Sequence, residues 1–222
     1  MIFPIGDDNI VGGHKPLVSY LFILLNCLVF FYELSLGPGV QDFLMTFGTI
    51  PNEIRQGVDM YTLFSSMFLH GGWMHLIGNM VFLWIFADNI EAIIGSMAFA
   101  FFYIVGGLFA SFIHIAFDPF SIVPAVGASG AISAVMGAYL VMFPKSKIKL
   151  IFILFFTRFT LPATIFLGFW FVQQLFNGMG ALGIDSTGGV AWWAHIGGFV
   201  YGLLGGFLIK RRFGHLYHYG SV

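Results

Sequence analysis

Residues 126–133 read Val126-Gly127-Ala128-Ser129-Gly130-Ala131-Ile132-Ser133. This stretch opens an apolar segment that continues to Phe143, and it sets one serine between glycines where a membrane helix is expected to begin. Much later, the segment 192–198 is also rich in small and apolar residues and carries His195 near its start. A serine hydroxyl is a poor nucleophile unless a positioned base removes its proton, and histidine is the commonest such base. We therefore expect Ser129 and His195 to meet.

The composition is that of a membrane protein. Of the 222 residues, 59% are hydrophobic and only 9% are charged, whereas soluble domains carry about 25% charged residues. The net charge of -1 offers no footprint for nucleic acid. The single cysteine, Cys27, excludes an intrachain disulfide. We expect one membrane domain over 17–212, between a short cytoplasmic N-terminus (1–16) and a short cytoplasmic tail (213–222).

The apolar stretches predict an all-α fold with six transmembrane helices, because roughly 20 apolar residues cross a bilayer. The spans are expected at 17–35, 73–87, 97–117, 129–143, 161–176 and 190–209. The connection 36–72 then forms a long first extracytoplasmic loop, rich enough in apolar residues to lie partly in the membrane interface. The apolar segment 150–160 contains Arg158, so we place it at the interface as well.

The basic residues predict the orientation. With six spans and the N-terminus inside, eight of the nine Lys and Arg residues fall on the cytoplasmic side, and only Arg55 does not. Both termini are then cytoplasmic, and Ser129 and His195 lie near the outer ends of their helices, where water is available for hydrolysis. The short termini favour a bacterial inner membrane.

Small residues predict that the fourth and sixth spans pack together. They recur every four positions, at 130, 134 and 138 in one span and at 194, 198, 202 and 206 in the other. Such faces let helix backbones approach closely in lipid, and Ser129 and His195 lie at the outer ends of these faces. The alternative is that the glycines only pack helices and that the serine and the histidine are incidental.

A polar cluster opens the second span, where His75 and Asn79 share a helix face and His70 lies in the preceding turn. Polar groups inside a membrane tend to face a polar cavity, so His75 and Asn79 are candidate donors to an oxyanion. They could instead form an interhelical hydrogen bond. A zinc site is less well supported because the sequence has no His-Glu-x-x-His motif.

Three motifs together resemble the rhomboid intramembrane serine proteases: Gly127-Ala128-Ser129-Gly130, Ala194-His195-Ile196-Gly197-Gly198, and the run from His70 through His75 to Asn79. The resemblance spans about 60–210. It implies a six-helix core, Ser129 as nucleophile, His195 as general base, and an oxyanion site formed by His75, Asn79 and the Ser129 N–H. Supporting positions are His70, Gly127, Gly130 and Gly198. The resemblance implies no cofactor and no metal.

Some rhomboids have a tyrosine one turn after the nucleophile, but this chain has Ser133 there. The sequence therefore does not identify the group that orients His195.

The expected function is an intramembrane serine endopeptidase that cleaves transmembrane segments of single-span membrane proteins within the lipid bilayer. One alternative is a non-catalytic rhomboid-like protein that binds membrane clients. Another is a transporter with a histidine-lined path, which would predict internal repeats. The Gly-rich loop 177–189 is expected to gate the site.

Overall fold

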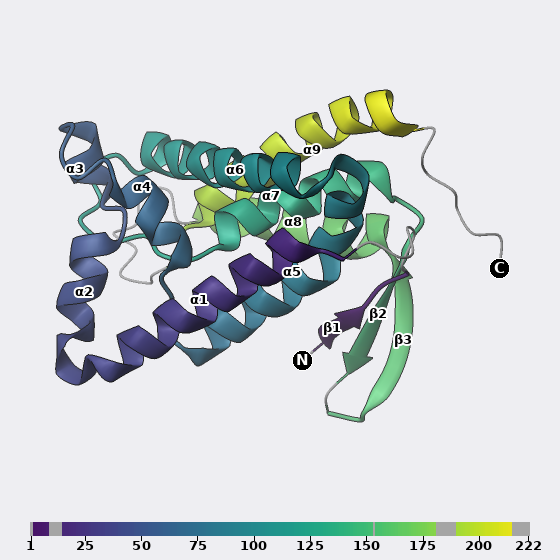
Figure 1. Ribbon diagram of the computed structural model, residues 1–222, viewed down its shortest axis with the longest axis horizontal. Helices are drawn as coiled ribbons and strands as arrows, with labels where there is room; N and C mark the ends of the chain where they lie inside the picture. The colour runs from purple at the N-terminus through teal and green to yellow at the C-terminus, as the bar shows by residue number, and fades with distance from the viewer. Residues whose placement is uncertain (1, 9–14, 153, 181–189, 215–222) are drawn as a thin grey trace.

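Long helices dominate the computed structural model, which describes residues 2–8, 15–152, 154–180 and 190–214 (Figure 1). A small β-sheet lies at one end of the helix bundle, and the short helices α2 and α3 lie at the opposite end. The long helices are α1 (Leu17–Ser35), α5 (Trp73–Ile94), α6 (Ser96–Phe117), α7 (Ser129–Met142), α8 (Ala163–Gly180) and α9 (Trp192–Phe213).

Four of these helices, α1, α5, α6 and α9, are each long and apolar enough to cross a membrane. The chain is therefore a multi-pass integral membrane protein. Of the other two expected spans, α7 is apolar but has only 14 residues. Helix α8 has 18 residues and includes Gln173, Gln174 and Asn177. The count of six spans stays a prediction.

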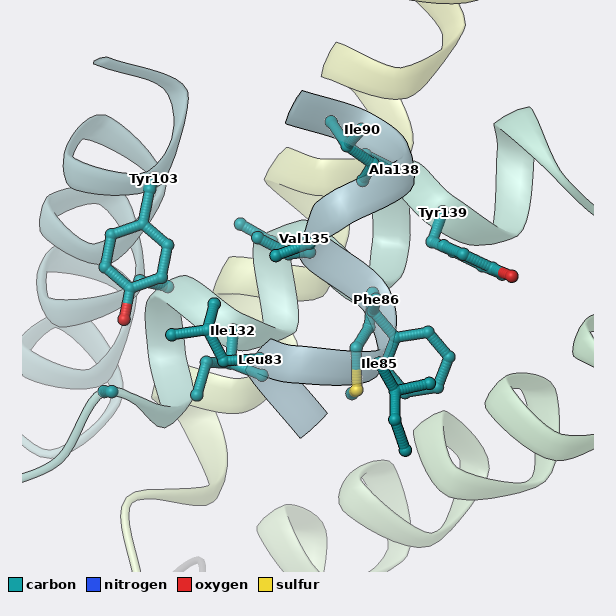
Figure 2. Close-up of a cluster of buried hydrophobic side chains, with 14 of the residues drawn as sticks. Leu83, Ile85, Phe86, Ile90, Tyr103, Ile132, Val135, Ala138 and Tyr139 are labelled. Carbon is teal, nitrogen blue, oxygen red and sulfur yellow. The ribbon is translucent and has the colours of Figure 1, made fainter. Parts of the chain in front are cut away.

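Helix α7 occupies the centre of the bundle. Every residue from Gly130 to Tyr139 is buried, as expected for a helix that is apolar on all sides. Figure 2 shows its side chains among those of α5 and of Tyr103 in α6. The labelled side chains are Leu83, Ile85, Phe86, Ile90, Tyr103, Ile132, Val135, Ala138 and Tyr139.

The expected close contact between α7 and α9 is present. A Cβ atom added to Gly198 would overlap the carbonyl oxygen of Gly130, and one added to Gly202 would overlap that of Ala134. At Gly206 an added Cβ would lie 2.7 Å from the Cα of Ala138. The two backbones therefore touch along the predicted lines of small residues, because side chains no larger than hydrogen leave them room.

The expectation of an all-α fold is wrong at the end of the bundle where α9 ends. The strands β1 (Ile2–Gly6), β2 (Lys147–Phe152) and β3 (Thr157–Pro162) form an antiparallel sheet in the order β1-β2-β3. In β2, Ile148 and Leu150 are buried and the neighbouring lysines are exposed. This alternation has the two-residue period of a strand. The overall hydropathy of the segment 150–160 did not indicate a strand. The predicted interfacial segment 150–160 is therefore mostly hairpin, and part of the predicted N-terminal segment 1–16 is a strand.

Asp7, just after β1, fastens this sheet to the bundle. Its Oδ2 accepts hydrogen bonds from Nδ2 of Asn89 on α5, at 2.8 Å, and from the hydroxyl of Tyr139 on α7. The Tyr139 hydroxyl also contacts Oγ of Ser146 at 2.8 Å. Burial raises the pKa of Asp7 to about 7, because a charged carboxylate loses its hydration there.

Helix α5 continues seven residues beyond the predicted end at residue 87, to Ile94. The polar segment 88–91 lies inside it because Glu91 has partners at the start of α1. Its carboxylate accepts from the backbone N–H of Val18 at 3.0 Å and from that of Ser19 at 2.9 Å. A carboxylate at a helix N-terminus satisfies amides that have no partner within the helix.

The connection 36–72 contains several short helical elements: η1 (Gly37–Gly39), α2 (Val40–Phe47), α3 (Pro51–Arg55), α4 (Thr62–Ser65) and η2 (Ser66–Phe68). It touches the segment before α7 through the paired backbones of Thr49 and Ala125. It also touches that segment where the Gly127 N–H donates to the Ser66 carbonyl at 2.9 Å. These contacts brace the start of α7.

Candidate active site

Ser129 is the first residue of α7, and His195 lies in the first turn of α9. The Ser129 hydroxyl and Nε2 of His195 are 2.8 Å apart, a normal hydrogen-bond distance. This contact follows from the backbone packing described above, since Gly130 directly follows Ser129 and Gly198 lies about one turn after His195. A serine next to an imidazole nitrogen is the arrangement needed to activate a hydroxyl.

Gln174 of α8 holds the other side of the imidazole. Nδ1 of His195 lies 2.9 Å from Oε1 of Gln174, and this glutamine is 4% exposed. With the amide oxygen as acceptor, Nδ1 carries the ring proton and Nε2 is free to accept from Ser129. The ring of Trp170 lies 5.9 Å from the imidazole. The motifs that point to Ser129 and His195 do not include Gln174, although an amide inside an apolar span is a signal of function.

Gly127 brings the backbone before Ser129 against the polar cluster on α5. Its φ of 123° lies in the region that favours glycine. A Cβ atom there would lie 2.7 Å from two ring atoms of His75 and 3.5 Å from Nδ2 of Asn79. A side chain at this position would therefore both strain the backbone and displace His75.

His75 and Asn79 line one cavity with Ser129 and His195. Asn79 is buried, and its Nδ2 donates to Nε2 of His70 at 2.9 Å. His70 lies in the loop that precedes α5 and holds the Asn79 amide through this hydrogen bond. Its own backbone N–H donates to Oε1 of Glu33 on α1 at 3.1 Å. The ring centroids of His70 and His75 are 5.1 Å apart. An amide NH₂ group has two hydrogens, so Asn79 can donate a second hydrogen bond.

The cavity has a volume of about 220 Å³ and lies between α5, α7, α8 and α9. Most of its lining is apolar, and its polar lining residues are His75, Asn79, Ser129, Ser133 and His195. The apolar lining includes Met74, Gly78, Phe82, Ile132, Met136 and Trp170. An apolar cleft with a few convergent polar groups is the usual form of a substrate site. Of the loop 177–189, the residues 181–189 lie outside those that the structure describes, so its gating role stays a prediction.

Comparisons with known proteins agree on one family. The Rhomboid domain matches residues 58–212. The rhomboid protease GluP of Bacillus subtilis is 31% identical over 201 residues, which cover 90% of this chain and 35% of the relative. The Rhomboid-like protease 5 of Toxoplasma gondii is 32% identical over 173 residues, covering 72% of this chain and 17% of the relative. The mitochondrial presenilin-associated rhomboid-like protein A of Danio rerio is 27% identical over 175 residues, covering 75% of this chain and 41% of the relative.

The chain spans between 17% and 41% of the length of these relatives. The match to the Rhomboid domain nevertheless includes Ser129, His195 and the cluster on α5. These are the residues that line the candidate active site. The chain belongs to the rhomboid family.

Proposed function

We propose that this rhomboid protein is a serine endopeptidase that cleaves transmembrane segments of single-span membrane proteins with a Ser129–His195 dyad. The observation that carries this proposal is the 2.8 Å distance between Oγ of Ser129 and Nε2 of His195. The dyad lies at a largely apolar cavity, which suits an apolar peptide segment. The protease relatives in the same family support the reaction class.

In the acylation step, Oγ of Ser129 attacks the carbonyl carbon of the scissile bond while its proton moves to Nε2 of His195. The carbonyl oxygen becomes an oxyanion. The tetrahedral intermediate collapses when the C–N bond breaks and the imidazolium gives its proton to the leaving amine. Water then attacks the acyl-enzyme, with His195 as base, and Ser129 regains its proton. No step needs a cofactor or a metal.

The oxyanion needs donors that are already in place. We assign this role to the backbone N–H of Ser129, the side chain of His75 and the second N–H of Asn79. Ser129 is the first residue of α7, and the first N–H groups of a helix have no partner within it. Donors preorganised where water is scarce stabilise a developing charge more strongly than water does.

Gln174 acts as a positioning residue in this scheme, since it contacts His195 rather than the reacting atoms. Its amide oxygen accepts from Nδ1–H of His195, and it thereby keeps the tautomer whose Nε2 can accept a proton. It fills the place that an aspartate holds in a catalytic triad, without adding a negative charge.

The proposed topology is six spans with both termini in the cytoplasm, in a bacterial inner (cell) membrane. The basic residues at one end of the bundle support this orientation, because Lys210, Arg211 and Arg212 in the last turn of α9 lie at the same end as β2. A Lys147→Cys variant should then react with thiol reagents only from the cytoplasmic side, and labelling from outside would refute this orientation.

The test of the reaction is active-site labelling together with substrate cleavage. The purified protein should react with a fluorophosphonate probe and cleave a single-span reporter protein, and Ser129→Ala should lose both. His195→Ala should be nearly as inactive, because an unassisted serine hydroxyl stays protonated at neutral pH. Ser133→Ala is the matched control, since Ser133 lies one turn later and its hydroxyl donates to the Ser129 carbonyl at 2.6 Å.

Two results would contradict the proposal. Cleavage that survives Ser129→Ala would place the nucleophile elsewhere. A folded wild-type protein that binds the reporter without cleaving it or reacting with the probe would favour the client-binding alternative.

A further inference from the structure

The turn between β2 and β3 presents three consecutive large apolar side chains to the surroundings. Leu154, Phe155 and Phe156 are 69%, 68% and 79% exposed. Exposed apolar side chains on a membrane helix face lipid and need no other explanation. A turn that joins two strands at the end of the bundle is different, because in water its apolar side chains would be unfavourably hydrated.

The hairpin is amphipathic in a definite sense. Ile148 and Leu150 of β2 are buried, and their cross-strand partners Leu161 and Phe159 pack against the same core. The opposite face of the hairpin carries Lys147, Lys149 and Arg158, all exposed. Side chains alternate between the two faces of a strand, so the apolar face covers the end of the bundle and the basic face points away from it.

Phe152 continues the apolar face beyond the last buried residue of β2. It shares the strand face of Ile148 and Leu150, and its ring lies 5.3 Å from that of Phe155. The apolar face therefore merges with the apolar turn, and together they extend past the part of the hairpin that packs on the bundle.

The direction of the hairpin relative to the helices indicates where its apolar turn lies in a membrane. In Figure 1 the hairpin runs across the direction of α1 and α5, at the end where α9 ends, and its turn projects past the side of the helices. The axes of spanning helices lie roughly along the membrane normal. A hairpin that crosses them at their end therefore runs along the membrane surface.

We propose that the β2–β3 hairpin is an interfacial anchor, whose turn at 154–156 inserts into the acyl boundary of the adjacent leaflet while Arg158 and Lys147 bind anionic phospholipid headgroups. Aromatic and leucine side chains beneath a basic face are the pattern of segments that lie in the interface. The proposal is independent of the protease reaction. Because Pro162 ends β3 and Ala163 begins α8, the anchor also sets the position of the helix that carries Gln174.

The test uses fluorescence quenching of single-cysteine variants in a Cys27→Ser background. An environment-sensitive fluorophore is attached through Phe155→Cys or, as the matched control on the exposed basic face, Thr160→Cys. Each protein is reconstituted into phosphatidylcholine vesicles with phosphatidylglycerol, with iodide present on both sides. Lipids spin-labelled on the acyl chain should quench the probe at 155 several-fold more than the probe at 160, and iodide should do the reverse. Leu154→Cys provides a second site in the turn.

Two outcomes would overturn the anchor. Equal access of iodide to positions 155 and 160 would mean that the turn lies in water. Protection from iodide without quenching by spin-labelled lipid would mean that a protein surface covers it. The proposed binding of anionic headgroups by the basic side chains is tested separately. Arg158→Glu should reduce lipid quenching at 155 in vesicles with phosphatidylglycerol but not in pure phosphatidylcholine. None of these measurements depends on cleavage, so their failure would leave the protease proposal untouched.

Discussion

Gln174 and His195 lie 21 positions apart on different helices, and the amide oxygen of one accepts the Nδ1–H of the other at 2.9 Å. The residue that orients the proposed base therefore comes from α8, whereas the proposed nucleophile comes from α7. The geometry of the dyad consequently depends on where α8 lies against α9.

Replacing Gln174 tests this dependence. Gln174→Leu removes the acceptor and should lower kcat by about 2- to 10-fold with little change in KM, because a net hydrogen bond is worth roughly 0.5–1.5 kcal/mol. Gln174→Glu keeps an acceptor and should retain more activity than Gln174→Leu. Nitrogen NMR of the labelled His195 ring should show the Nδ1–H tautomer in the wild type and a mixture in Gln174→Leu.

Gln173→Leu is the control for this experiment, because Gln173 is exposed on the same helix. A tautomer signal that is unchanged in Gln174→Leu would remove the positioning role even if activity fell.

The oxyanion donors give a second prediction. Asn79→Ala and His75→Ala should each lower kcat by about 10²–10³-fold, the loss seen when one such donor is removed from other acyl-transfer enzymes. Both variants should still react with the fluorophosphonate probe. If both side chains stabilise one charge, the double variant should lose less than the product of the two single losses.

Thermal unfolding of the same preparations separates this role from a structural one. Ile77→Ala serves as the control, since Ile77 lies on α5 and is exposed. Lower stability with unchanged kcat in both variants would identify His75 and Asn79 as packing groups.

The backbone at Gly127 gives a third prediction. Gly127→Ala should lower both stability and activity, because a φ of 123° is strained for alanine and the new Cβ would meet His75 at 2.7 Å. Backbone strain of this kind costs on the order of 1–3 kcal/mol. Gly71→Ala is the control, since a Cβ there would meet no atom within 4 Å. Equal melting temperatures for the two variants would contradict the prediction.

Asp7 gives a prediction about pH. Its pKa in the folded protein is about 7, raised mainly by burial from 3.8, so the folded state holds a proton between these values that the unfolded state releases. Its contribution to stability is therefore fully present below about pH 4 and is lost as pH rises to about 7. Nearby Asp88 raises the pKa and Lys149 lowers it. The total is on the order of a few kcal/mol, at about 1.4 kcal/mol per pKa unit.

The midpoint of unfolding in detergent, measured from pH 4 to pH 8, checks this effect. Asp7→Asn should flatten the dependence, because an amide oxygen can still accept from Tyr139 and Asn89 but does not titrate. An equally steep dependence in Asp7→Asn would assign the effect to other groups.

The sequence predicted the elements whose signals are local. The repeat of small residues at four-residue spacing predicted the contact of α7 with α9, and that contact brings Ser129 to His195. The sheet was missed because β1 and β2 are far apart in the chain and short, and an apolar segment such as 150–152 reads equally well as an interfacial segment.

The hydrogen-bond partners of the polar side chains also could not be predicted from the sequence. The sequence placed His70 near the site, but its contact with Asn79 depends on the turn before α5. Gln174 is next to Gln173, and only the packing of α8 against α9 decides which of the two meets His195.

The bond between Asp7 and the bundle also has a consequence for biosynthesis. The segment 2–7 is made before its strand partner, which begins at Lys147, and before α5 and α7, which carry the hydrogen-bond donors to Asp7. At typical rates of translation, the order of ten seconds passes before that partner leaves the ribosome. Asp7 can be buried only after α5 and α7 stand side by side. Docking of the first strand is therefore a late event, and it takes place only in a chain whose central helices have already assembled.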